Sequence, residues 1–167
     1  MKYLKNVIIL TVLLTLAFCS SKDEKMIYGE AKNLIKSGKY DEAVVKFEEI
    51  VNNYPKSTVA DSSLFEIAKL YQGQVIKNVK HMESLNKAVD SYKKIYENYP
   101  NSKLAESSLF MSAFILANEI RNFPLAEKTY KLYLEKYPNG ELADDAKMEL
   151  QNLGKSPEDI LRNQNTL

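Results

Sequence analysis

The chain offers one cysteine and one histidine for nucleophilic or metal chemistry. His81 has no cysteine, second histidine or fixed carboxylate cluster nearby, so it cannot form a zinc site of the ordinary ligand count. A Ser-His-Asp triad would also need His81, and no Gly-x-Ser-x-Gly segment is present. The five glycines form neither of the glycine-rich runs that hold phosphate groups. We therefore expect no enzyme activity, no metal and no cofactor.

The cysteine, Cys19, stands at the end of a basic and then apolar N-terminal segment. Lys2 and Lys5 precede an apolar run from Val7 to Phe18 that contains only threonine as a polar residue. A helix that crosses a bilayer needs about 20 apolar residues, so this run is too short to span one comfortably. It is typical of a secretory signal peptide. A single cysteine in a secreted protein cannot form an internal disulfide, so it needs another explanation.

Residues Leu16-Ala17-Phe18-Cys19 resemble the lipobox of bacterial lipoproteins, in which an aliphatic and a small residue precede the cysteine at these positions. Phe18 departs from that pattern, since Gly, Ala or Ser is usual before the cysteine. The resemblance implies that Cys19 is diacylated on sulfur and becomes the N-terminus after cleavage. Ser20, which follows it in place of aspartate, favours sorting to the outer membrane by the same resemblance. The alternative is a spare thiol or an ordinary signal-peptide residue.

Composition sets broad limits on the rest of the chain. Without residues 1–18 it carries nearly equal numbers of basic and acidic side chains. No basic excess indicates binding to nucleic acid, and no long block of like charge is present. The remaining length supports one hydrophobic core without disulfides.

A segment of fifteen residues occurs twice with nearly the same sequence, and a third time with weaker similarity. It reads VNNYPKSTVADSSLF at residues 51–65, YENYPNSKLAESSLF at 96–110 and LEKYPNGELADDAKM at 134–148. Repetition of this kind is the signature of a stacked-repeat architecture, in which each copy belongs to one structural unit. No stretch alternates apolar and polar residues convincingly enough to be a strand.

An alanine begins an apolar pattern shortly before each copy: Ala43, Ala88 and Ala126. Aromatic or aliphatic residues follow each alanine at offsets of 4, 7 and 11, and proline follows at 12. These offsets share one face of an α-helix. The proline ends the helix, because it disfavours helical geometry in the residue before it. The small residues expected at close helix–helix contacts are Ala31, Ala43, Ala68, Ala88, Ala113 and Ala126, and the large ones beyond them are Phe47, Tyr92 and Tyr130.

One such pair of helices cannot bury its apolar face alone, so neighbouring pairs must stack. The sequence therefore predicts an all-α protein, an α-solenoid of about three helical hairpins plus a closing helix, after the signal peptide. The middle hairpin carries an extra segment at 73–84 that could extend a helix or form a loop. The expected parts are a signal peptide at 1–18, a lipidated tether at 19–26, a repeat domain at 27–153 (hairpins at about 27–57, 58–102 and 103–140, closing helix at 141–153) and a polar tail at 154–167.

The pattern of small and large residues resembles the tetratricopeptide repeat over most of residues 27–153. The joint Tyr-Pro-x-Ser-x-x-Ala is similar to the subclass found in bacterial envelope proteins. With the lipobox before it, the chain resembles the BamD family of the outer-membrane barrel-assembly machinery, although that family usually carries five repeats and this chain has three. The residues that carry the tetratricopeptide resemblance in the first repeat are Ala31, Leu34, Gly38, Tyr40, Ala43, Phe47, Ile50 and Pro55.

The resemblance implies a lipid-anchored scaffold of the outer membrane that faces the periplasm, with barrel-protein assembly as the process it would serve. In peptide-binding tetratricopeptide domains the first helix of each pair lines a concave groove. Lys32, Lys69 and Phe114 in such a groove would suit a peptide that carries a carboxylate and an apolar anchor residue. The alternative for each residue is an ordinary exposed side chain. The candidate groove residues are Lys32, Lys36, Lys69, Gln72, Phe114 and Asn118.

Two other functions stay open at this point. A pilot or stabilising lipoprotein for a secretion or pilus machine can share this fold. A lipoprotein that binds a glycan or small ligand belongs to a different class, and the absence of tryptophan and of catalytic motifs weighs against it. In the first two cases the partners are other envelope proteins, bound through the concave groove, together with the membrane, bound through the lipid.

Overall fold

The computed structural model describes residues 23–156, 158 and 159, and within these residues every regular element is a helix. The signal peptide, Cys19 and most of the polar tail fall outside the described residues. The predicted all-α class is confirmed. The elements are α2 (Glu24–Lys36), α3 (Tyr40–Asn53), α4 (Ala60–Gln72), α5 (His81–Asn98), α6 (Ala105–Phe114), the π-helical η1 (Ile115–Glu119), α7 (Phe123–Lys136) and α8 (Ala143–Asn152).

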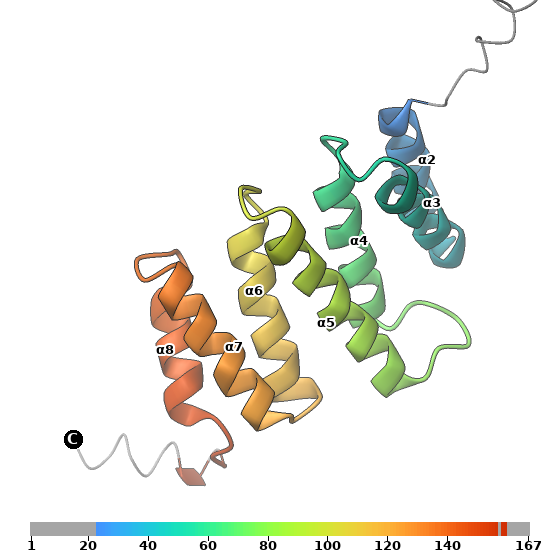
Figure 1. Cartoon of the computed structure of the whole chain (residues 1–167). Helices are drawn as coiled ribbons and strands as arrows, with labels where there is room; N and C mark the ends of the chain where they lie inside the picture. The colour runs from blue at the N-terminus through green and yellow to red at the C-terminus, as the bar shows by residue number, and fades with distance from the viewer. Residues whose placement is uncertain (1–22, 157, 160–167) are drawn as a thin grey trace, which may run out of the picture.

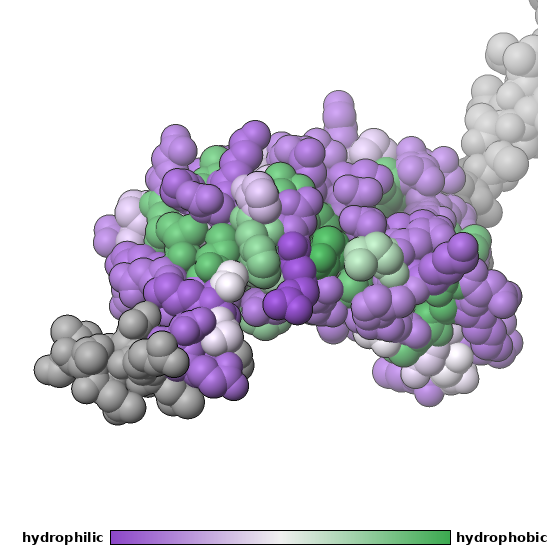
Figure 2. Space-filling view, turned by 90° about the horizontal axis from the view of Figure 1, so that it is seen from below, coloured by the Kyte–Doolittle hydropathy of each residue, from purple (hydrophilic) through white to green (hydrophobic). Residues whose placement is uncertain are grey.

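The helices form three antiparallel hairpins that stack side by side, with α8 closing the far end (Figure 1). The hairpins are α2 with α3, α4 with α5, and α6–η1 with α7. Each helix packs mainly against its neighbours in the sequence, so the second helix of one hairpin contacts the first helix of the next. Seen from below, the stack is arched, with a hollow between its two ends (Figure 2).

The second helix of every hairpin ends in the same way, at a tyrosine followed by proline. The backbone of Tyr54, Tyr99 and Tyr137 has φ of −131°, −128° and −130°, and ψ of 53°, 55° and 60°. These values lie outside the helical region, as the proline after each tyrosine requires. The sequence expectation that Tyr-Pro ends the helices is therefore confirmed.

The core follows the repeated small residues. The six alanines predicted at helix–helix contacts are all fully buried, and so are the large side chains beyond them, Phe47, Tyr92 and Tyr130. Alanine lets two helix backbones approach closely, and each aromatic ring packs against a ring on the other helix of its own hairpin. Phe65 of α4 packs edge-on against Tyr92 of α5, with ring centroids 5.5 Å apart.

Residues 73–80 of the extra segment form a loop, and residues 81–84 are the first turn of α5. α4 ends at Gln72, α5 begins at His81, and the residues between them contain two left-handed positions, Gln74 (φ 54°) and Asn78 (φ 57°). The loop is held against the first hairpin by the backbone amide of Lys77, which donates to Asp41 Oδ1 at 3.1 Å. His81 is exposed, and its Nδ1 lies 2.7 Å from Gln74 Oε1, so this histidine helps to hold the loop in place.

At two successive joints an acidic residue near the start of the preceding first helix accepts a side-chain hydrogen bond, and the donor differs between the two joints. At the joint between the second and third hairpins, Ser102 Oγ donates to Asp61 Oδ2 at 2.6 Å. At the next joint Glu106 and Gly140 occupy the positions of Asp61 and Ser102, and the hydroxyl of Tyr133 donates to Glu106 Oε1 at 2.6 Å. A Cβ on residue 140 would collide with the carboxylate of Glu106. The longer acid is therefore paired with glycine, and the shorter acid with serine.

This pairing predicts an energetic coupling between the two positions. Gly140→Ser should destabilise the fold by about 1 kcal/mol, because the new side chain displaces Glu106 and breaks its hydrogen bond with Tyr133. In a Glu106→Asp background the same substitution should cost less, since the shorter acid leaves room for the new side chain, while the Tyr133 hydroxyl still lies 2.8 Å from a Cβ at residue 140. Urea melts of the wild type, both single variants and the double variant measure this coupling. Additive effects would show that the two positions are independent.

Candidate functional site

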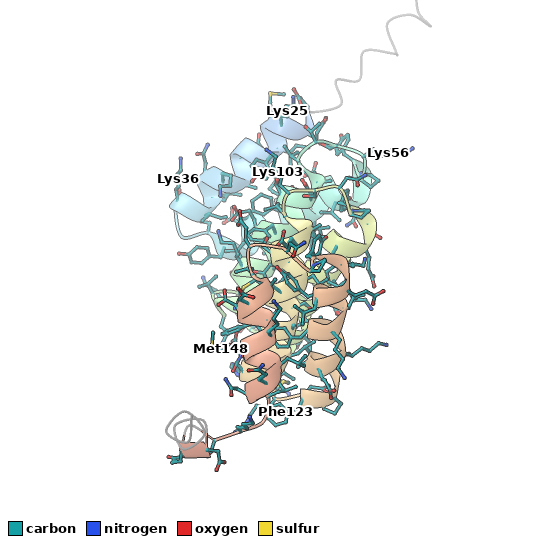
Figure 3. All side chains as sticks on the ribbon, turned by 90° about the vertical axis from the view of Figure 1, so that its left-hand side faces the viewer. Lys25, Lys36, Lys56, Lys103, Phe123 and Met148 are labelled. Carbon is teal, nitrogen blue, oxygen red and sulfur yellow. The ribbon has the colours of Figure 1, made fainter. Side chains whose placement is uncertain are left out.

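Direct contacts join the first helices of successive hairpins into one continuous surface, which we call the first-helix face. Lys32 of α2 contacts Glu66 of α4, and Gln72 of α4 contacts Glu119 of η1. The chain of contacts continues to α8 through Asn118 and Glu149, so the face crosses the whole stack. All six candidate groove residues lie on α2, α4, α6 or η1, the elements that form it. Seen from the C-terminal end, Lys36 of α2 and Met148 of α8 lie on one side of the stack, with Lys56 on the other (Figure 3).

The part of the face formed by α2 and α4 is cationic. Lys32 Nζ lies 2.7 Å from Glu66 Oε1, and Lys69 Nζ lies 3.6 Å from Glu66 Oε2. The Glu66 side chain is only 14% exposed, while those of Lys32 and Lys69 are 38% and 54% exposed. One carboxylate therefore holds two lysines in place with their ammonium groups at the surface. Lys36 is exposed and makes no ion pair with any described residue, so this end of the face has an excess of positive charge.

Gln72 lies at the centre of the face and connects three helices. Its Nε2 donates to Glu119 Oε1 at 3.1 Å, and its Oε1 accepts from the hydroxyl of Tyr92 at 3.2 Å. Burial, with the negative charges of Glu119 and Glu66 nearby, raises the pKa of Tyr92 to about 12. The hydroxyl therefore stays protonated at neutral pH and remains a donor. This half-buried glutamine is fixed in its orientation by both contacts.

Phe114 adds an apolar side chain to the part of the face formed by α6. Its ring is half-buried and stacks on Phe110, with centroids 6.4 Å apart and planes inclined by 21°. Met111, one turn earlier on α6, is also half-buried and packs against the core. Residues three apart share a helix face, so Met111 and Phe114 form one apolar strip.

The far end of the face is a pocket of about 350 Å³ between η1 and α8. Asn118 Nδ2 donates to Glu149 Oε2 at 3.3 Å across it, and Met148 and Ala117 line its apolar part.

The buried Tyr130 hydroxyl has no hydrogen-bond partner within the described chain. Burial, and secondly the nearby Glu149 carboxylate, raise the pKa of Tyr130 well above its ordinary value.

The structure brings the six predicted residues onto one face and adds three carboxylates that the sequence reading missed: Glu66, Glu119 and Glu149. A signal for two of them was present. Glu66 follows Ala60 by six residues, as Glu149 follows Ala143, so both hold the same register on equivalent helices. Glu119 had no such signal, because the π-helical turn of η1 shifts the register after Ile115.

The described residues hold no group of His, Cys, Asp and Glu side chains that could bind a metal ion. None of the helices in this part of the chain is both long enough and apolar enough to cross a bilayer.

Three stacked hairpins, a closing helix and a continuous face along their first helices define a helical-repeat protein of the tetratricopeptide type. Residues 20–156 match the YfiO family, described as outer membrane lipoproteins. The chain belongs to this family, so the resemblance to BamD-type lipoproteins is confirmed and the protein is an outer-membrane lipoprotein of the cell envelope. A search of curated proteins finds no match.

Proposed function

We propose that this protein is a lipid-anchored scaffold that binds other envelope proteins through the first-helix face, and that it serves the assembly of outer-membrane barrel proteins. The observation that carries the proposal is the continuity of that face, which runs from Lys32 on α2 to Glu149 on α8 through side-chain contacts. The chain belongs to an outer-membrane lipoprotein family, which supports a role in the cell envelope.

The composition of the face favours binding over catalysis. Its carboxylates are each held by a lysine or an amide. Within the described residues, the pocket at η1 and α8 contains neither a nucleophile paired with a base nor a metal cluster. Such an arrangement suits recognition of a segment of another chain. We expect a dissociation constant in the micromolar range for an isolated segment, which corresponds to about 8 kcal/mol, because ordering a flexible peptide offsets part of the contact energy.

Photo-crosslinking in cells from positions 32, 69 and 114, followed by identification of the adducts, tests the proposal. Recovery of a barrel-assembly subunit supports it in full. Recovery of a secretin or pilus component instead keeps the scaffold role but assigns it to a pilot lipoprotein. Absence of protein adducts from all three positions, with a glycan or small molecule bound to the native protein, would overturn it.

A further inference from the structure

The chemistry of the first-helix face changes in a fixed order along the stack. At the α2–α4 end Lys32 and Lys69 share a single carboxylate, Glu66, and Lys36 is exposed with no ion pair among the described residues. A partner residue that meets this end gains the most if it is acidic, because two positive charges are left without a counter-ion. Both charges are at the surface, so the attraction operates in water and is screened by salt.

The next step, on α6, is apolar at the positions where α4 is charged. Met111 follows Ala105 by six residues, as Glu66 follows Ala60, and therefore takes the register of Glu66. Phe114 takes the register of Lys69, one residue after the buried alanine of its helix. A charged pair on α4 is thus replaced by an apolar pair on α6. A partner side chain over α6 is favoured if it is apolar.

The last step, at η1 and α8, is acidic. Glu119 and Glu149 accept hydrogen bonds from the side-chain amides of Gln72 and Asn118, and these amides carry no positive charge. No ion pair within the described chain includes either glutamate. Both carboxylates therefore lack a cationic partner on this face.

The pocket beside Glu149 has room for a long basic side chain. Its apolar wall at Met148 and Ala117 can cover an aliphatic stem while the head reaches the carboxylate, the usual arrangement for lysine and arginine. Two cations of the protein itself, Arg121 and Lys155, also line the pocket. The guanidinium of Arg121 lies over the ring of Phe123, with Cζ 5.9 Å from the ring centroid, and neither cation pairs with Glu149.

We propose that the first-helix face selects its partner by the order of charge along the bound segment: an acidic residue over α2–α4, an apolar residue over α6, and a lysine or arginine in the pocket at α8. This inference rests on the proposed function and adds the chemistry and direction of the partner.

Peptide binding tests the order directly, with the full chain purified in detergent. The probes are synthetic peptides of one composition: a glutamate pair, a leucine pair and a lysine pair with serine between them. Two probes carry the ordered pattern, written in either chain direction, and two carry alternating charges. At low salt we expect the better ordered probe to bind about tenfold tighter than the alternating ones, the sum of several weak charge pairs. A crosslinker at its glutamate end should label α2 or α4, and one at its lysine end should label α8.

A charge-swapped protein supplies the matched test. The double variant Lys69→Glu, Glu149→Lys should lose the tenfold preference, whereas Lys131→Glu on the exposed side of α7 should keep it. Equal binding of ordered and alternating probes, including no measurable binding of either, overturns the charge order. Protein adducts from positions 69 and 114 in cells would then still support the scaffold function, so the two claims fail separately.

Discussion

Replacing Cys19 by serine should remove the protein from the outer membrane. The prediction follows from the basic and apolar segment before Cys19 and from its being the only cysteine in the chain. Two acyl chains on one residue anchor a protein stably, whereas a single chain gives marginal binding. No described helix is long and apolar enough to cross a membrane. We therefore expect the outer-membrane fraction to contain almost none of the Cys19→Ser variant.

Fractionation of cells and mass spectrometry of the purified N-terminus measure this effect. In the wild type we expect a mature chain that begins at Cys19 and carries a diacylglyceryl group on sulfur. Ser21→Ala is the matched control, a change of similar size two residues after the cysteine that should leave the anchor intact. A wild-type chain that begins elsewhere, or an unmodified thiol, would contradict the assignment.

Enlarging a buried alanine should be the most damaging change within the repeat domain. Ala68 and Ala113 are 0% exposed and stand at equivalent positions on the first helices of two hairpins. Leucine at either position forces the helices apart, and overpacking of this kind costs about 1–3 kcal/mol. Domains of this size are stable by only about 5–15 kcal/mol, so the loss is a large fraction of the total.

Lys69→Ala is the control for the alanine substitutions, since residue 69 follows Ala68 directly and its side chain is 54% exposed. Its ion pair with Glu66 is long and near the surface, so its loss should cost about 0.5 kcal/mol or less. Urea melts of the three variants and the wild type compare the two effects. A lysine change as damaging as the alanine changes would mean that the inward and outward sides of α4 are wrongly assigned.

The elements that depend on local rules were predictable from the sequence. The Tyr-Pro steps end α3, α5 and α7 because the steric effect of proline acts on the residue beside it. The buried alanines follow from the helical period, which places offsets of 4, 7 and 11 on one face. Fifteen residues of repeated sequence then fix how one hairpin joins the next, since equal joints need equal residues.

The polar contacts of the first-helix face were not predictable in the same way. Lys32 and Glu66 are 34 residues apart in the sequence, and Gln72 and Glu119 are 47 apart, so each contact depends on how two hairpins stack. The π-helical turn at Ile115–Glu119 adds a further shift, with the amide of Ile120 donating to the carbonyl of Ile115 at 2.9 Å. This turn sets where Asn118 and Glu119 point. The sequence pattern placed the candidate lysines and Phe114 on the face but did not identify the acids that hold or oppose them.

We propose that partner proteins bind at the first-helix face. Site-specific photo-crosslinking in cells compares this face, at positions 69 and 114, with position 131 on α7, whose lysine is exposed and pairs with Glu127. We predict protein adducts of the same envelope partner from both face positions and none above background from position 131. Adducts from position 131 alone, with none from 69 or 114, would contradict the claim.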